Sequence, residues 1–460
     1  MELFSLLQSP KLTLFFIYTK IQPMYRYLFL FICVLAYFGC QQKMKRSFLL
    51  SYPTEFQNGI PVSYDNPSDN PCKELFNYLP DTLNPDHTPL KYIKVNFHIV
   101  NNTARTANFD EKTGVTFINE VMKCANSKLG RNKPMHLPLD NNTPLIPMRY
   151  RYELTPDPKR PGDDGIYFHY DDDMYYVMNN GPNKNNGDRK VYEKYGIQKD
   201  TVMNIFVLDF PKDSALAATY NFNSNGVAFG SWVKVIGWHH DVQDTIMEPN
   251  GKRWKTPRGK WYAQKNLNHE IGHNLGLSHS WTRNDGCDDT PPHPNCFGGT
   301  KEGPCKEQWS NNFMDYNVYS SSWSPCQISK AHQNMMGMGR KKKLREMIKK
   351  TWCELDPINK IIIKDDVAWN GAKDMESHIE IRKGGSLSIR CKVSLPKGAK
   401  ISVYPGGKLI LDGAHLYNDC GEQWEGIEIL TAGDKKGEVV YGSYGAEILD
   451  VVNGDFEIEE

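Results

Sequence analysis

Residues 266–281 read NLNHEIGHNLGLSHSW, and the interpretation of the whole chain starts from this stretch. On an α-helix, His269 and His273 lie one turn apart on the same face, so both imidazoles can reach a common point. Glu270 is rotated by about 100° from His269, which sets a carboxylate beside the pair. The spacing therefore predicts a helix that carries two metal ligands and an adjacent general base.

The third histidine of the stretch can join the first two only if the helix ends before it. In a continued helix, His279 would lie about 9 Å beyond His273 and face away. Gly276 tolerates the positive φ that ends a helix, so a turn there would bring His279 back. Three neutral imidazoles and a water make the open tetrahedral site of a catalytic zinc, and Glu270 is placed to take a proton from that water.

Two further motifs accompany the histidines and give the chain a family resemblance. The segment 269–279 resembles the zinc signature of the metzincin metalloproteases, and residues 311–317, NNFMDYN, resemble their Met-turn. Residues 287–292, CDDTPP, are similar to a stretch of the pappalysin branch, which includes cytophagalysin-type bacterial proteases. The resemblance extends over about residues 90–350. It implies an α+β catalytic domain, with a twisted mixed sheet plus the zinc helix.

The resemblance also implies roles for residues of the Met-turn. Met314 would form an apolar floor beneath the zinc, and Tyr316 would stabilise the oxyanion of the tetrahedral intermediate; the alternative for both is packing alone. Pappalysins that prefer a basic residue after the scissile bond carry an acidic residue just before their last cysteine in this region. Pro325 stands at that position here, so a different specificity pocket is expected.

Disulfides and calcium ligands are also implied near this motif. The chain has 11 cysteines, and four of them cluster without a C-x-x-C pair, which favours two disulfides over a metal knuckle in an exported protein. The family pattern implies that Cys287 pairs with Cys305 and Cys296 with Cys326. Family members bind calcium nearby, and the candidate calcium ligands here are Asp288, Asp289 and Thr290.

The N-terminal segment has the pattern of an export signal. Met24 is expected to be the true start, and it precedes a short basic lead and an apolar run too short to span a bilayer. Gly39-Cys40 resembles the cleavage and lipidation site of bacterial lipoproteins, so residues 1–40 are assigned to the signal region. The predicted location is therefore extracytoplasmic, either secreted or as a cell-surface lipoprotein whose membrane contact is the anchor at Cys40.

Residues 41–88 are rich in Pro, Asn, Asp and Ser and are expected to be a propeptide or linker without a core of its own. Cys72 is the one thiol in this segment. It could hold the zinc in a latent state, because a thiolate is a good zinc ligand, or it could pair with Cys124.

The catalytic domain is assigned to residues 89–353. Apolar patterning predicts the zinc helix and, before it, one strand, one helix and three more strands, at residues 92–100, 113–129, 147–154, 202–208 and 226–236. Residues 155–200 contain Asp171-Asp-Asp173 and are expected to be a surface loop, or else a weak calcium site.

The remaining residues, 354–460, are assigned to a β-rich C-terminal accessory domain. The segments 383–389, KGGSLSI, and 405–411, PGGKLIL, recur 22 residues apart, and 424–429, WEGIEI, is interpreted as a third rung. This period suits a parallel β-helix, with a small β-sandwich as the alternative.

The charge composition argues against nucleic acid as a binding partner. The 55 basic and 54 acidic residues leave a net charge of +1, so no global field would attract nucleic acid. The sequence thus predicts a zinc-dependent endopeptidase that acts on extended polypeptides, with one catalytic Zn²⁺ and a structural Ca²⁺ as a further candidate. The alternatives are a vestigial zinc-holding adhesin that binds through its C-terminal β domain, and a zinc amidase or deacetylase acting on cell-wall material. The oligomeric state is not assigned.

Overall fold

A mostly parallel sheet with one antiparallel edge strand, β6, forms the centre of the N-terminal domain, and β2 (Lys91–Asn101) is one of its inner strands. Side chains of β2 from Val95 onward are buried on both faces, as expected for a strand whose sheet is covered on both sides. The strand order is β3-β2-β5-β7-β6, and β4 also pairs with β2. The other strands are β3 (Tyr150–Leu154), β4 (Ile166–Tyr170), β5 (Met203–Leu208), β6 (Gly226–Ala228) and β7 (Trp232–Ile236).

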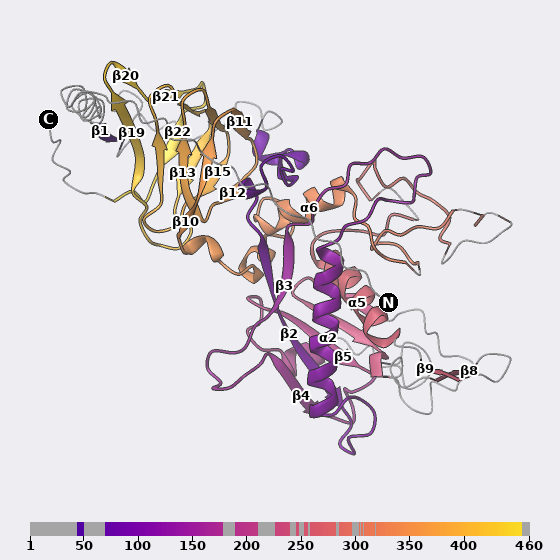
Figure 1. Ribbon diagram of the computed structural model, residues 1–460. Helices are drawn as coiled ribbons and strands as arrows, with labels where there is room; N and C mark the ends of the chain where they lie inside the picture. The colour runs from indigo at the N-terminus through magenta and orange to yellow at the C-terminus, as the bar shows by residue number, and fades with distance from the viewer. Residues whose placement is uncertain are drawn as a thin grey trace, which may run out of the picture.

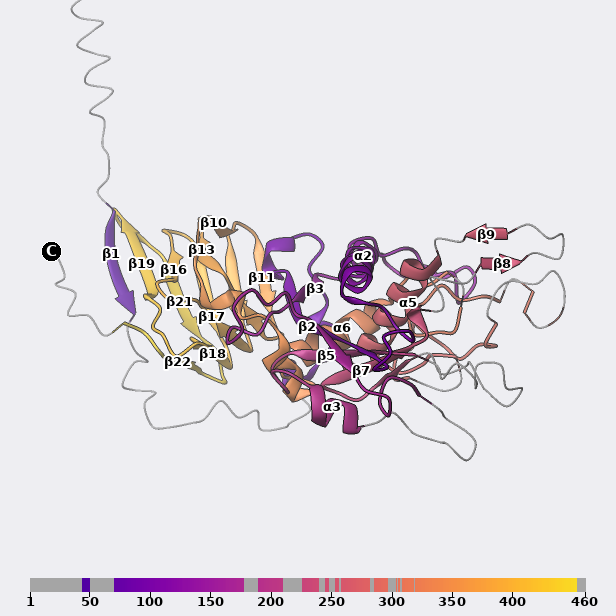
Figure 2. The same cartoon turned by 90° about the horizontal axis from the view of Figure 1, so that it is seen from below.

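The computed structural model describes residues 44–49, 70–177, 189–209, 226–239, 245–247, 253–255, 258–281, 285–296, 303, 305–306, 308–317 and 319–452. A mixed α/β domain lies at one end of an elongated molecule and a coiled β domain at the other (Figures 1 and 2). A short hairpin, β8 (Thr245–Met247) and β9 (Arg253–Lys255), stands at the α/β end. No helix among the described residues is long and apolar enough to cross a bilayer.

Two helices pack together beside the sheet. α2 (Glu111–Leu129) begins at Asp110, whose side chain accepts a hydrogen bond from the Thr113 amide and so caps the helix. α5 (Arg258–Asn274) carries the histidine motif, and its apolar side chains Leu267 and Ile271 enter the same core as β2 and α2. α6 (Pro325–Met335), which follows the Met-turn in the chain, packs its apolar side chains into the same core.

The segment predicted to be a loop, residues 155–200, contains β4 and α3 (Arg189–Tyr195). Asp171 accepts hydrogen bonds from Lys194 and Tyr195, and Asp172 accepts them from Thr103. These protein donors occupy the carboxylates, so the structure gives no support to a calcium site there. The strand predicted over residues 226–236 is two strands, because the chain reverses at Gly230, where φ is +89°.

The expectation that residues 41–88 form no core is wrong for the part described. β1 (Lys45–Leu49) pairs with a strand of the β domain, and residues 70–88 form the 3₁₀ turns η3 (Pro71–Lys73), η4 (Leu75–Tyr78) and η5 (Pro85–His87). Cys72 forms a disulfide with Cys391, whereas Cys124 is a buried free thiol. Both hypotheses for Cys72, a latent zinc ligand and a partner of Cys124, are therefore wrong: its sulfur is bonded to the β domain.

Three parallel sheets coil through the C-terminal domain. The first contains β10 (Asp356–Ile363), β13 (Ser377–Ile381), β16 (Lys400–Val403) and β19 (Gly426–Ala432), with β1 and β20 (Lys435–Lys436) paired antiparallel to β19. The second contains β11 (Asp366–Trp369), β14 (Ser386–Ile389), β17 (Lys408–Leu411) and β21 (Glu438–Tyr441). The third contains β12 (Lys373–Asp374), β15 (Lys392–Ser394), β18 (Ala414–Tyr417) and β22 (Ala446–Ile448).

The 22-residue repeat corresponds to neighbouring strands of one sheet. Leu387 on β14 pairs with Leu409 on β17, and both are fully buried in the coil interior. The third rung was predicted one strand too early, since residues 426–432 belong to the first sheet. The next strand of the second sheet is β21, where Glu438 pairs with Lys408. The turn around β20 lengthens this coil and shifts the repeat.

Buried ion pairs join the two domains. Asp374 on β12 accepts hydrogen bonds from Lys91 on β2 and from Arg345, at 2.9 Å, on η6 (Lys342–Met347). Arg345 also bonds to Asp419 at 2.8 Å. A second interdomain disulfide, Cys353–Cys420, follows η7 (Thr351–Cys353). Because charges this deeply buried require their partners, the docking between the domains is specific.

Candidate metal centre

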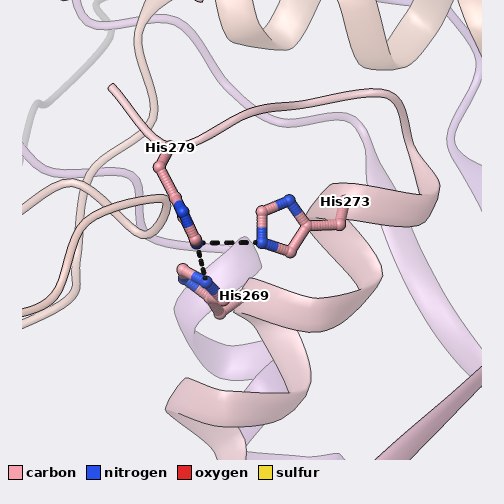
Figure 3. Close-up of side chains that lie close together, drawn as sticks. All are labelled: His269, His273 and His279. Carbon is pink, nitrogen blue, oxygen red and sulfur yellow. Dashed lines mark hydrogen bonds between the residues drawn. The ribbon is translucent and has the colours of Figure 1, made fainter. Parts of the chain in front are cut away.

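Three histidine side chains converge at the end of α5 (Figure 3). His269 and His273 project from the last two turns of the helix, and His279 returns from the segment that follows it. The Nε2 atom of His279 lies 3.0 Å from Nε2 of His269 and 3.1 Å from Nε2 of His273. Three Zn–N bonds of about 2.1 Å in a tetrahedron place their nitrogens about 3.4 Å apart, so the arrangement matches a three-imidazole site.

Backbone carbonyls fix the orientation of two of these rings. Nδ1 of His269 lies 2.6 Å from the Phe313 carbonyl oxygen, and Nδ1 of His273 lies 2.8 Å from the Leu277 carbonyl oxygen. Because a carbonyl oxygen only accepts, each Nδ1 must carry the proton and donate. The Nε2 lone pairs of both rings therefore face the common point, in the tautomer that a metal requires.

The lone pairs of the three imidazole nitrogens also favour a bound cation at this point. A neutral His279 can donate from Nε2 to only one of its two close neighbours, which leaves the other contact between two lone pairs. A bound divalent metal would satisfy all three nitrogens at once. Burial lowers the pKa of His269 to about 3, and burial also lowers the pKa of His273, so both rings stay neutral, as ligation demands.

The turn at Gly276 returns the chain to the site. Its φ is +93°, its amide donates to the His273 carbonyl, and the Leu277 amide donates to the Gly272 carbonyl at 3.0 Å. A Cβ at Gly276 would lie 2.5 Å from Nδ2 of Asn334, which itself donates to the Leu275 carbonyl. Glycine is therefore required twice at this position, by backbone conformation and by space.

Glu270 lies beside the cluster and is almost fully buried, with 7% of its surface exposed. A Cβ built on Gly226 of β6 would lie 2.5–2.7 Å from the Glu270 carboxyl group and Cγ, so this glycine makes room for the side chain. Burial raises the pKa of Glu270 to about 8. The sequence singled out Glu270 but not Gly226, which lies 44 residues earlier in the chain.

Met314 packs beneath the helix and is fully buried. A Cβ on Gly272 would lie 2.5 Å from its sulfur, so the first glycine of the histidine motif allows the Met-turn to approach α5. The Met314 amide donates to the Asn312 side chain, and Asn312 bonds to Gln327 of α6. Met314 thus packs against α5 and is connected through Asn312 to α6.

Tyr316 is 42% exposed and faces the histidines. Its ring centroid lies 4.9 Å from that of His279 and 5.9 Å from that of His269. Burial raises the pKa of its hydroxyl, and the charge of Glu270 raises it further, so the phenol stays protonated and can donate. The structure therefore brings together all of the predicted zinc and catalytic residues.

A polar network behind the Met-turn was missed by the sequence interpretation. Asp315 accepts hydrogen bonds from Ser280 and Ser310, both at 2.5 Å, and from Nε2 of His293 at 3.0 Å. Burial opposes the charge on His293, but Asp315 raises the pKa of this imidazole. The carboxylate thereby fixes the residues next to His279 and Tyr316. Asp315 and its hydrogen-bond partners are spread over 35 positions of the chain, so no local sequence pattern predicts this network.

The disulfide pairing implied by the family resemblance is wrong. The structure pairs Cys287 with Cys326 and Cys296 with Cys305. The Cys326 amide at the start of α6 donates to Asp289, which brings residues 287–289 against that helix. Cys296 and Cys305 close a short loop of their own.

The predicted calcium ligands are only partly available for an ion. Asp289 caps α6, and the Thr290 hydroxyl donates to Asp285. Asp288 is exposed. Cys287, Asp289 and Cys326 lie close enough to hold a metal, but the two sulfurs are joined in a disulfide and are not thiolate ligands. Calcium binding remains a prediction.

Comparisons with known proteins give a weak structural likeness. No protein-family model matches the chain, and no curated protein matches it. Two similar solved structures are mirolysin in complex with a compound, at 18% identity and a TM-score of 0.38, and mature mirolysin of Tannerella forsythia in complex with a cleaved peptide, at 17% and 0.36. Each alignment covers 56% of this chain and 96% of the other. At these values the likeness alone assigns neither fold nor activity to this chain.

Proposed function

We propose that this protein is a zinc-dependent endopeptidase of the metzincin type. The observation that carries the proposal is the convergence of three Nε2 atoms, oriented by backbone carbonyls, next to a buried carboxylate. Three protein ligands leave a fourth tetrahedral position for water or substrate, which distinguishes a catalytic zinc from a structural one. The pappalysin-like stretch at residues 287–292 and the segment at residues 311–317 that resembles a metzincin Met-turn support the same assignment.

Zinc held by His269, His273 and His279 would supply a Lewis acid and lower the pKa of a bound water. Glu270 acts as the general base that removes a proton from the attacking water and then passes it to the leaving amine. Burial raises the pKa of this carboxyl group above the ordinary value for glutamate, which makes the carboxylate a stronger base. Gly226 keeps the carboxylate close to the histidines by offering no side chain.

The remaining groups bind and orient the peptide. β6 is the edge strand of the sheet and lies against α5, so an extended substrate can add to it as a further strand. The phenol of Tyr316, half exposed above the histidines, donates a hydrogen bond to the oxyanion of the tetrahedral intermediate.

The test combines activity with metal content. Purified protein is incubated with an unfolded protein substrate, stripped with a chelator, and reconstituted with one equivalent of Zn²⁺. We expect internal cleavage that is lost and regained with the metal. Glu270→Gln should lower kcat/KM by about 10²–10⁴-fold while elemental analysis still finds one zinc per chain. His279→Ala should lose the zinc itself.

Two results would replace this function with another. Zinc binding without cleavage of any unfolded protein would indicate a vestigial enzyme that serves as an adhesin. Release of amines or acetate from cell-wall fragments without proteolysis would indicate an amidase or deacetylase.

We further propose that the enzyme is exported and anchored by a lipid at Cys40, which lies outside the described residues. The motif at residues 24–40 supports this proposal. Labelling with a radioactive fatty acid should modify the wild type and not Cys40→Ala, which should be released into the medium. A structural Ca²⁺ near Asp288 completes the proposal, and it predicts a calcium-dependent rise in the melting temperature.

A further inference from the structure

A large pocket opens one helical turn from the metal centre. Its volume is about 960 Å³, and it lies between the C-terminal end of α2, the first half of α5 and the chain that follows the Met-turn. Lys265 on α5 belongs to its wall and precedes His269 by four residues, so both side chains lie on the same face of the helix. Along the axis this separation is about 6 Å.

The pocket wall is strongly basic. Four cations line it, Lys128, Arg131, Lys133 and Lys265, and no Asp or Glu does so. The whole chain is nearly balanced, with 55 basic and 54 acidic residues, so this local excess does not follow from composition. Among the described residues, no carboxylate forms an ion pair with Lys128, Arg131 or Lys133. Within the part of the chain that the structure describes, the charged side chains that line the pocket are therefore all positive.

The remaining wall is made of aromatic and small polar side chains, and Lys265 connects it to the metal centre. Trp261 is 46% exposed and Tyr319 is 63% exposed, which is unusual for such large rings. The amine of Lys265 donates to the carbonyl of Asn317, the residue after Tyr316. The same side chain thus borders the pocket and supports the loop that carries the oxyanion donor.

We propose that this pocket binds an acidic side chain, Asp or Glu, of the polypeptide substrate within one to three residues of the scissile bond. The inference rests on the proposed peptidase function and adds a substrate preference to it. An extended chain advances about 3.3–3.6 Å per residue, so a pocket about one helical turn away is reached by a residue close to the cleaved bond. Arg131 offers the planar fork that pairs with a carboxylate, and the lysines add charge.

The test uses sets of internally quenched peptides with an amidated C-terminus. Within a set the peptides are identical except for Glu, Gln or Lys at one position, which lies one to three residues from the cleaved bond on either side. The amide removes the terminal carboxylate, so only the side chain can supply the negative charge. We expect the wild type to cleave the best Glu peptide about tenfold faster, by kcat/KM, than its Gln counterpart, and the Lys peptide more slowly than both. Raising the salt concentration should shrink this ratio.

The double variant Arg131→Gln, Lys133→Gln separates the pocket from the chemistry. We expect its Glu-to-Gln ratio of kcat/KM to fall close to one. The matched control is Lys260→Gln, because Lys260 also lies on α5 but pairs with Glu120 outside the pocket. This control should keep the wild-type ratio.

The outcomes distinguish the pocket from the proposed function. Cleavage of Glu and Gln peptides at equal rates overturns the pocket assignment and leaves the peptidase intact. Absence of cleavage of every peptide by zinc-loaded wild type overturns the peptidase itself.

Discussion

The α/β domain and the β-helix bury very different side chains. Around the metal centre the interior contains His269, Glu270, Asp315 and several amides and hydroxyls, and specific hydrogen bonds hold His269 and Asp315. The apolar cluster inside the coiled β domain is mostly Ile, Leu and Val, with a few Ala, Trp and Met side chains. Polar groups held by directional bonds can do chemistry, whereas an aliphatic stack supplies only stability. The proposed chemistry therefore lies at one end of the molecule, and the aliphatic stack lies at the other.

The largest effect should come from the contact that joins the two regions. Asp374→Asn removes the carboxylate shared by buried Lys91 and Arg345, which leaves uncompensated charge at the interface. We expect about 4 kcal/mol less unfolding free energy, measured by denaturant titration. Glu153→Gln, which breaks an exposed pair with Lys349, should cost less than about 1 kcal/mol. Equal losses in both variants would mean that the domains are not docked through Asp374.

A change inside the β-helix should lower stability and leave the site alone. Leu409→Ala leaves a cavity between fully buried rungs, so we expect about 3 kcal/mol of destabilisation. Zinc affinity, measured by competition with a chromogenic chelator, should not change. Lys408→Ala on the same strand, whose side chain is partly exposed, serves as the control. Weakened zinc binding in Leu409→Ala would break the division between support and function.

A substitution that adds one methyl group beside the metal centre should instead lower activity. Gly226→Ala places a Cβ where the Glu270 carboxyl group lies, so the base must move. We expect about a hundredfold loss in kcat, because a displacement of about 1 Å at the reacting group has this effect, with zinc content unchanged. At Gly230, in the same hairpin, a Cβ meets nothing within 4 Å, so Gly230→Ala should affect the backbone only. Full activity in Gly226→Ala would show that Glu270 is not positioned by β6.

The smallest effect is expected for the oxyanion donor. Tyr316→Phe keeps the ring against His279 and removes the hydroxyl, so kcat should fall about tenfold with little change in KM. Tyr319→Phe on the same loop should leave the cleavage of a neutral peptide unchanged. A rise in KM without a fall in kcat would identify Tyr316 as a packing residue.

Sequence patterns predicted those features in which the signal is local. The i, i+4 histidines, the glycine that ends the helix and the 22-residue repeat each depend on residues close together in the chain, and each corresponds to an arrangement in the structure. The same reasoning set the phase of the third rung wrongly, because the inserted turn around β20 breaks the period.

Features that depend on distant partners were missed or wrong. Gly226 acquires its role only when β6 lies against α5, and the Asp315 network joins three separate segments. The pairing of Cys72 with Cys391 spans 319 residues, which no spacing rule covers. The pairing of Cys287 with Cys326 depends on where α6 begins. Such contacts are set by the tertiary fold rather than by local pattern.

The two interdomain disulfides would hold the domains together after a single proteolytic cut between them. Cys72–Cys391 and Cys353–Cys420 each cross from the α/β domain or its N-terminal extension to the β-helix. A single backbone nick in the connection after Cys353 would therefore leave both halves covalently tethered, and the nicked molecule would run as two bands only after reduction. An enzyme that works among other hydrolases could lose that peptide bond and still keep its shape.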